Sequence, residues 1–473
     1  MRNSHVLTLV LLVLILALAL SIHAQTYSVL YNFGNQSGDP YWPKYSGLVV
    51  QGQDGNLYSA APNGGVYGYY GAAFKVTPAG TLTLLYSFDA THGSYPYGGL
   101  TLGTDGNFYG TTLQGGASDV GTIFKLTASG NLTVLYNFTN GSDGAGPLAP
   151  PIQGRDGNFY GTASLGGTGY GTFYKITPSG TFTRLYQFDV THGSHPWAPL
   201  VQGTDGSFYG MTLDGGANNY GVVYRVTASG SFTVLYNFDN ANGANPVGPL
   251  VQGSDGKFYG TTVVGGTSAN GVVFEITPAG TLTVLHHMSG TDGVQPYAGL
   301  VQATDGNFYG ANLGGGSNGY GTIFRITPQG SYAVLYNLDL TTGQWPYVTP
   351  FQHTNGIIYG DTYAGGTGNV TPCAVGYCGV FYSLDLSLKP FVRLVSTSGR
   401  PAQIVGVLGQ GFTGTTNVYF NGVRAQFTVK TDTYLEAKVP IRASSGSVTV
   451  VTPSGTLTSN TPFRVENPAV GLK

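Results

Sequence analysis

The stretch of the chain with the most chemical potential is the short loop that holds His192 and the triplet His195-Pro196-Trp197. A histidine can act as a general base when a partner orients it against a substrate. Four aspartates in the same class of loop could together hold a hard cation such as calcium: Asp89, Asp189, Asp239 and Asp339. Because they recur in register, we prefer turns that each aspartate caps through its own backbone. No partner for either histidine is evident, so we predict no catalytic residue, no metal site and no cofactor.

Aromatic residues are the second group with chemical potential. One set follows a proline in these loops: Tyr41, Tyr97, Trp197, Tyr297 and Tyr347, with Leu148 and Val247 at the two remaining places. Another set lies in the other long loops: Tyr70, Tyr170, Tyr220 and Tyr320. Aromatic faces can stack on sugar rings, although rings that recur in register can also wedge between neighbouring units. The candidate ligand-binding residues are Tyr41, Tyr97, Trp197, Tyr297, Tyr347, Tyr170, Tyr220, Tyr320, His192 and His195.

These residues are positioned by a motif that returns every 49 to 51 residues. An Asp-Gly pair precedes a tyrosine seven times, from Asp54-Gly55 with Tyr58 to the variant Asn355-Gly356 with Tyr359. Each repeat holds four short β-patterned segments, which in the third repeat are 151–153, 159–162, 171–177 and 182–188. Four antiparallel strands in about 50 residues match one blade of a β-propeller. Such units cannot bury a core alone, so the array must fold as a whole.

The two ends of the array complement each other. Residues 26–33 have the pattern of a fourth strand without the other three, whereas the seventh repeat lacks its fourth strand. We therefore predict an all-β fold: a seven-bladed β-propeller closed by the N-terminal strand, followed by an immunoglobulin-like β-sandwich. Closure of the ring would remove the exposed sheet edges. Connectivity places the tight Asp-Gly turns on one face and the long Tyr-rich loops on the other, where binding sites concentrate.

Composition and the N-terminus point to export. Charged residues make up 8% of the 473 residues and the formal net charge is −2, which removes the electrostatic argument for a nucleic-acid partner. Arg2, an apolar run at 6–20 and small residues at 21–24 are typical of a signal peptide. The alternative, an uncleaved anchor, would be shorter than the roughly 20 residues that span a bilayer. We expect a secreted or cell-surface protein, not integral to the membrane, with a local disulfide between Cys373 and Cys378.

The period stops near residue 388. We expect a signal peptide at 1–24, the propeller at 25–388, a second β-domain at 389–467 and a tail at 468–473. In that second domain, Gly409-Gln410-Gly411-Phe412 and the Val-Tyr-Phe-Asn-Gly segment at 418–422 resemble the IPT/TIG family of immunoglobulin-like domains, which implies an interaction or spacer role. The repeats, exemplified by residues 250–280, resemble the GloVer tandem-repeat family of exported bacterial proteins, which implies export and no established reaction.

These features favour an exported, non-enzymatic binding or cell-surface protein whose Tyr-rich face recognises a glycan or surface polymer. One alternative is a secreted propeller enzyme, a lyase or hydrolase acting on a glycan or lactone-like substrate. The Asp-Gly-Asn-Phe-Tyr and Ile-Thr-Pro-x-Gly segments of the repeats loosely resemble streptogramin-inactivating lyases, which imply His/Glu acid–base chemistry and magnesium. The predicted propeller, however, contains a single glutamate, Glu275, at a repeated strand position. The other alternative is a structural envelope or matrix protein. A catalytic site should break the repeat, and the strongest break is the insertion at 367–378. The oligomeric state is not indicated.

Overall fold

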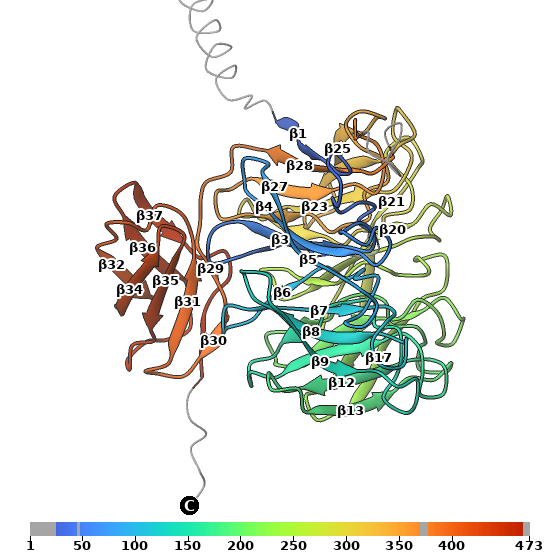
Figure 1. The fold of residues 1–473 in the computed structure, drawn as a ribbon, viewed down its shortest axis with the longest axis horizontal. Coiled ribbons are helices and arrows are strands. Elements are labelled where there is room, and N and C mark those ends of the chain that lie inside the picture. The colour runs from blue at the N-terminus through green and yellow to red at the C-terminus, as the bar shows by residue number, and fades with distance from the viewer. Residues whose placement is uncertain (1–24, 45–47, 369–376, 467–473) are drawn as a thin grey trace, which may run out of the picture.

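A computed structural model describes residues 25–44, 48–368 and 377–466 (Figure 1). Every regular element assigned to these residues is a β-strand, which confirms the expected all-β class. The described residues include no helix with the length and apolarity needed to cross a membrane.

Residues 26–385 form seven four-stranded antiparallel sheets, one for each repeat. The strands of the first three sheets are β2 (Val50–Gln51), β3 (Leu57–Ala61), β4 (Ala72–Val76) and β5 (Leu82–Ser87); β6 (Thr101–Leu102), β7 (Phe108–Thr112), β8 (Thr122–Leu126) and β9 (Leu132–Asn137); and β10 (Ile152–Gln153), β11 (Phe159–Ala163), β12 (Thr172–Ile176) and β13 (Phe182–Gln187). Those of the next three are β14 (Val201–Gln202), β15 (Phe208–Met211), β16 (Val222–Val226) and β17 (Phe232–Asn237); β18 (Val251–Gln252), β19 (Phe258–Thr262), β20 (Val272–Ile276) and β21 (Leu282–His287); and β22 (Val301–Gln302), β23 (Phe308–Asn312), β24 (Thr322–Ile326) and β25 (Tyr332–Asn337).

The seventh sheet combines the two ends of the array. It contains β26 (Phe351–Gln352), β27 (Ile358–Asp361) and β28 (Val380–Asp385), and its fourth strand is β1 (Thr26–Asn32). β1 runs antiparallel to β28, with Thr26 opposite Asp385 and Asn32 opposite Val380. The start of the chain therefore supplies the strand that the seventh repeat lacks.

Glutamine side chains tie neighbouring sheets together at their first strands. Each of five glutamines accepts, through Oε1, a hydrogen bond of 2.8–3.1 Å from a backbone N–H in the Asp-Gly turn of the preceding sheet: Gln153, Gln202, Gln252, Gln302 and Gln352. Gln51 of the first sheet accepts the same bond, at 3.1 Å, from Thr354 of the seventh. The last sheet thus contacts the first through the same kind of hydrogen bond that links five other pairs of neighbouring sheets.

The repeated Asp-Gly motif forms one hydrogen-bond network at each turn. In the second sheet, Asp105 Oδ1 accepts the N–H of Asn107 at 3.1 Å, and Asp105 Oδ2 accepts the hydroxyl of Tyr109 at 2.9 Å. The Tyr109 ring is buried and stacks on Phe159 of the next sheet, with ring centroids 3.8 Å apart. Burial, and then the hydrogen bond to Asp105, raise the pKa of Tyr109 above its usual range. The motif therefore fixes a turn and packs two sheets at once.

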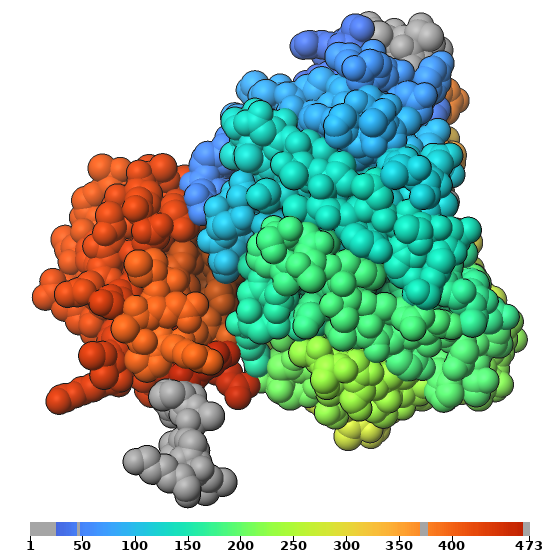
Figure 2. Space-filling view, turned by 60° about the horizontal axis from the view of Figure 1, so that its bottom comes forward, coloured from blue at the N-terminus to red at the C-terminus, as the bar shows by residue number. Residues whose placement is uncertain are grey.

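The residues after the seventh sheet form a second domain, a separate lobe in Figure 2. One of its sheets contains β29 (Arg393–Leu394), β31 (Ile404–Leu408), β35 (Tyr434–Lys438) and β34 (Gln426–Thr431); the other contains β33 (Val423–Arg424), β32 (Asn417–Phe420), β36 (Val448–Thr452) and β37 (Gly455–Thr458). β30 (Ser398–Gly399) pairs in parallel with β38 (Arg464–Val465). Apolar side chains of both larger sheets, including Val407 and Phe420, share one core.

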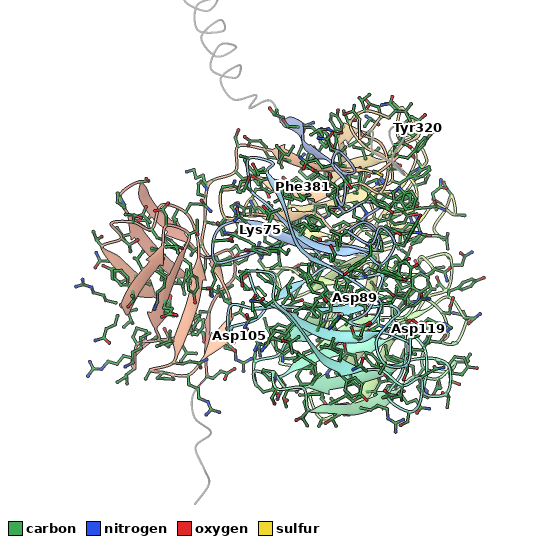
Figure 3. All side chains as sticks on the ribbon, in the orientation of Figure 1. Lys75, Asp89, Asp105, Asp119, Tyr320 and Phe381 are labelled. Carbon is green, nitrogen blue, oxygen red and sulfur yellow. The ribbon has the colours of Figure 1, made fainter. Side chains whose placement is uncertain are left out.

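The second domain packs against the face of the array that carries the Asp-Gly turns. Thr433 Oγ1 donates to the carbonyl of Gln53 at 2.8 Å, and Arg393 Nη2 donates to the carbonyl of Gln352 at 2.8 Å. We call this side the turn face and the opposite side, with the long loops, the loop face. In Figure 3, Asp105 of the turn face lies beside the second domain, and Tyr320 of the loop face lies away from it.

Candidate functional site

Each of the seven long loops that lead from the fourth strand of one sheet to the first strand of the next contains a residue with a left-handed backbone immediately before a proline. The φ angle at these seven positions lies between 53° and 58°, and we call them the pre-proline ring: Trp42, Tyr95, Gly146, His195, Asn245, Gln295 and Trp345. In all seven, the backbone N–H donates at 2.8–3.2 Å to a carbonyl in the loop of the preceding sheet. Positive φ is uncommon for bulky side chains and costs of order 1–3 kcal/mol. The ring is thus a repeated, strained backbone feature.

A pocket of about 480 Å³ opens on the loop face beside Gly146. Its lining residues are Tyr97, Leu113, Leu148, Ser164, Leu165, His195, Trp197, Leu213 and Asp214. A Cβ placed on Gly146 would lie 3.3 Å from Leu113 Cδ1 and 3.4 Å from Ser164 Oγ. Both of those side chains line the pocket, so a side chain added at Gly146 would begin against the pocket wall.

A chain of polar groups enters this pocket. His195 Nδ1 lies 3.2 Å from Asp214 Oδ2, and Asn245 Nδ2 donates to Asp214 Oδ1 at 3.3 Å and to the Leu213 carbonyl at 3.0 Å. The side chains of His195 and Asp214 are 30% and 34% exposed, so water reaches both. When Nδ1–H donates to the carboxylate, Nε2 of the neutral imidazole keeps its lone pair. The arrangement is a base, a carboxylate that orients it and an amide that holds the carboxylate.

The polar groups of the pocket break the repeat. Asp214 forms an isolated β-bridge with Ser194. Gln114 forms the same bridge with Ser94, and Leu165 forms it with Ala145. Asp214 is therefore the structural equivalent of Gln114 and Leu165. Ser164, one position before Leu165, is equivalent to Leu113 and Leu213 in the same register. Our sequence analysis named His195 but missed Asp214, Ser164 and Gly146. A position-by-position comparison of the seven repeats would have singled them out.

His192 lies outside the pocket. Its Nδ1 lies 2.9 Å from Asp189, and its backbone N–H donates to the same carboxylate at 2.7 Å. Burial acts to raise the pKa of Asp189, but the hydrogen bonds from the ring and backbone of His192 outweigh it, and that pKa is lowered. Because His92 and Asp89 form the same pair in another repeat, this geometry closes a turn.

Two of the predicted aromatic residues, Tyr97 and Trp197, line the pocket. Tyr297 and Tyr347 instead pack edge to face, with ring centroids 5.1 Å apart. The second predicted set supplies backbone carbonyls to the pre-proline ring: Tyr170 to His195, Tyr220 to Asn245 and Tyr320 to Trp345. The Tyr170 ring also meets the His195 ring edge to face at 6.4 Å. The structure thus brings part of each predicted set together and leaves the rest in packing roles.

Tyr41 does not belong to the set in which we placed it. Its bridge to Asn63 corresponds to that of Ser94, three positions before Tyr97, so the residue equivalent to Tyr97 is Lys44. Tyr41 is buried, and its hydroxyl donates to the carbonyl of Gly68. The loop contains two prolines, Pro40 and Pro43, and the register follows the second one.

The aspartates considered as cation ligands bond to their own turns. Asp239 accepts the N–H of Asn242 at 2.8 Å, and Asp339 accepts that of Thr341 at 2.8 Å. Within the described parts of the chain, no group of three or more His, Cys, Asp and Glu side chains is placed to hold a metal ion. Cys378 is buried and disulfide-bonded; Cys373, its predicted partner, lies outside the described residues.

Comparison with known families identifies the repeats. Three overlapping matches cover residues 17–168, 148–374 and 265–417, and the chain belongs to the Gloeobacter/Verrucomicrobia repeat family. No curated protein matches the chain. The resemblance of the repeats to this family is confirmed, whereas the IPT/TIG resemblance of the second domain stays a prediction.

Several solved structures resemble the chain at low identity. The periplasmic gluconolactonase of Pseudomonas aeruginosa has 17% identity and a TM-score of 0.45, covering 69% of this chain and 98% of its own. A Bacteroides uniformis protein, whose title proposes a 6-phosphogluconolactonase, has 14% identity, a TM-score of 0.46 and coverage of 82% and 97%. A luciferin-regenerating enzyme has 12% identity, a TM-score of 0.41 and coverage of 78% and 97%.

These neighbours contradict one expectation. The interpretation as a non-enzymatic binding or cell-surface protein is not supported, since the resembling structures are described as enzymes. The ligand class of that interpretation, a glycan or surface polymer, rested on aromatic loops alone, and of those aromatics Tyr41 is buried while Tyr297 and Tyr347 pack against each other. With TM-scores below 0.5, the neighbours say nothing of which reaction this chain performs, so a reaction has to be argued from the pocket.

Proposed function

We propose that the chain is a hydrolase of small esters or lactones, with the pocket beside Gly146 as its active site. One observation carries the proposal: the hydrogen-bonded series His195–Asp214–Asn245 enters a water-accessible pocket, and its histidine and aspartate occur in one repeat only. A base oriented by a carboxylate is what acyl transfer to water requires.

In this mechanism His195 activates a water molecule. As the water oxygen bonds to the carbonyl carbon, His195 Nε2 accepts a water proton, and the carbonyl π electrons move onto oxygen. The tetrahedral intermediate then collapses, the C–O bond to the leaving alkoxide breaks, and His195 returns the proton to that oxygen. Asp214 keeps Nδ1–H directed at its carboxylate and stabilises the transient imidazolium.

The pocket lining sets the class of substrate. Four leucines and the rings of Tyr97 and Trp197 form most of its wall, and none of the lining residues is a lysine or arginine. Such a wall favours a neutral molecule with an apolar or ring-bearing body, because a phosphate or carboxylate would lose its hydration without gaining a countercharge. A lactone or an aryl ester fits both the wall and the base.

We also infer that the seven sheets are the blades of one closed propeller. The pairing of β1 with β28 and the bond between Gln51 and Thr354 support closure. The signal-like N-terminus supports export, and the two packed sheets of the second domain are compatible with an immunoglobulin-like spacer.

The test is hydrolysis of p-nitrophenyl butyrate and δ-valerolactone by the protein and by His195→Asn and Asp214→Asn. General-base catalysis contributes roughly 10²–10⁴-fold, so each variant should lose at least 100-fold in kcat/KM. His192→Asn is the matched control, because His192 also pairs with an aspartate in the same kind of loop but lies outside the pocket. It should retain activity within twofold. Equal losses in all three variants, or no hydrolysis by the unmodified protein, would refute the proposal.

A further inference from the structure

The pre-proline ring repeats its backbone but not its side chains. The following residue is proline in all seven repeats, whereas the ring itself holds two tryptophans, a tyrosine, a glycine, a histidine, an asparagine and a glutamine. Glycine would adopt this backbone without strain at every position. Six positions nevertheless carry side chains in this uncommon backbone conformation. The backbone conformation alone therefore does not require those side chains.

Where the ring residue is tryptophan, its side chain lies near another aromatic ring of the loop face. The ring centroids of Trp345 and Trp42 each lie 6.0 Å from that of Tyr363. The pocket lies beside Gly146, and the three side chains nearest to its missing Cβ, those of Leu113, Ser164 and Leu165, are pocket-lining residues. Two further members, His195 and Asn245, converge on Asp214 from consecutive repeats.

We propose that the pre-proline ring is the specificity-determining element of the loop face, and that Gly146 is the residue that admits the substrate. The size of the side chain at each ring position decides whether a junction between two sheets is open or closed. At Gly146 the absent side chain creates the space for the ring-bearing body of a neutral ester or lactone. The identity of that substrate rests on the proposed function, whereas the control of the opening does not.

The variant that tests this is Gly146→Asn. Asn245 adopts φ 53° at the equivalent position, close to the 58° of Gly146, so the backbone accepts asparagine. The new side chain would start 3.3–3.6 Å from Leu113, Ser164 and Leu165, which needs only small shifts, and would extend into the pocket. We expect a fall of at least 20-fold in kcat/KM for p-nitrophenyl butyrate and a similar loss of affinity for 2-naphthol, measured by calorimetry. The urea midpoint should stay close to that of the unmodified protein.

The matched control is Gln295→Asn, which places the same side chain elsewhere on the ring. It should leave turnover and 2-naphthol affinity within twofold. If Gly146→Asn does not fold, Gly146→Ala carries the test, with a smaller loss of about two- to fivefold expected. Unchanged turnover and 2-naphthol affinity in the folded Gly146 variant, or equal losses in the control, would overturn the proposal.

The two proposals fail in different ways. If the protein hydrolyses no ester or lactone but binds 2-naphthol, and Gly146→Asn abolishes that binding, the hydrolase proposal fails and control of the opening stands. If His195→Asn abolishes turnover while Gly146→Asn does not, the hydrolase proposal stands and the ring proposal fails. If the unmodified protein neither binds 2-naphthol nor hydrolyses the substrates, both fail.

Discussion

The turn face and the loop face are built from the same seven repeats, yet they repeat different things. On the turn face the side chains repeat: in six turns an aspartate accepts the hydroxyl of the tyrosine four residues later, at 2.7–3.0 Å. On the loop face the backbone repeats, with φ between 53° and 58°, and the side chains differ. Repeated side chains give six turns the same hydrogen bond. A repeated backbone offers seven equivalent places where one unusual group can create a site.

The largest predicted effect in this comparison is on the pH dependence of the free energy of unfolding. It comes from His353, the histidine of the turn face. His353 occupies the position that is Gly103 in the second turn. Its Nε2–H donates to the carbonyl of Gly55 at 2.9 Å, and its Nδ1 accepts the N–H of Asn355 at 3.2 Å, a pattern that requires the neutral ring. Burial lowers the pKa of His353 from 6.5 to about 4, with a smaller contribution from the charge of Arg393.

The sign of the pH dependence follows from where the proton binds. Between pH 6.5 and 4 the unfolded chain takes up a proton at His353 and the folded chain does not. The free energy of unfolding therefore falls as the pH drops through this window, by up to about 3 kcal/mol. Urea unfolding at pH 7 and pH 4.5 should show a loss of about 2–3 kcal/mol that His353→Gln lacks. Equal losses in both proteins would place the acid sensitivity elsewhere.

A smaller effect should follow from breaking one repeated side-chain network. Asp105→Ala leaves the buried hydroxyl of Tyr109 without its acceptor, so it should lower the free energy of unfolding by about 1–2 kcal/mol. Asp105→Asn should cost less than half of that, because Asn355 of the seventh turn bonds to the Tyr359 hydroxyl at 3.0 Å. Urea midpoints at pH 7 measure both. Hydrolysis of p-nitrophenyl butyrate should not change, since this turn lies on the face opposite the pocket.

On the loop face the same kind of deletion should affect activity and spare stability. Asn245→Gly removes the amide that holds Asp214 and relieves a positive φ, so the fold should keep its urea midpoint. Asn245 acts through Asp214 and is a positioning residue. We expect kcat to fall about tenfold with KM nearly unchanged, equivalent to about 1.4 kcal/mol in the transition state. A lowered urea midpoint with unchanged kcat would make Asn245 structural and would remove the contrast between the faces.

The features that the sequence predicted are those encoded locally. The four-stranded unit follows from alternating residues and glycine turns, and the strand at 26–32 shows its own fourth-strand pattern. His195, Trp197 and Tyr97 stand out by residue type. Asp214 does not, because its partner lies 19 residues away and only the fold shows that they meet. Gly146 was missed for another reason: its contribution is an absent side chain, and glycine is common in this chain.

The smallest predicted effect concerns buried tyrosines with and without a hydrogen-bond acceptor. Replacement by phenylalanine should change the free energy of unfolding in opposite directions at the two kinds of position. Tyr174 lies in β12 where β8 and β20 carry Phe124 and Phe274, and its buried hydroxyl has no hydrogen-bond partner among the residues that the structure describes. Burial raises its pKa above the usual range for a tyrosine. Tyr174→Phe removes a desolvated hydroxyl and keeps the ring, so it should raise the free energy of unfolding by up to about 1 kcal/mol. Tyr109→Phe makes the same chemical change but loses the bond to Asp105, and it should lower that free energy. If urea unfolding shows the same loss in both variants, the Tyr174 hydroxyl has a hydrogen-bond partner. The repeated strand positions would then tolerate less side-chain variation than the loop face does.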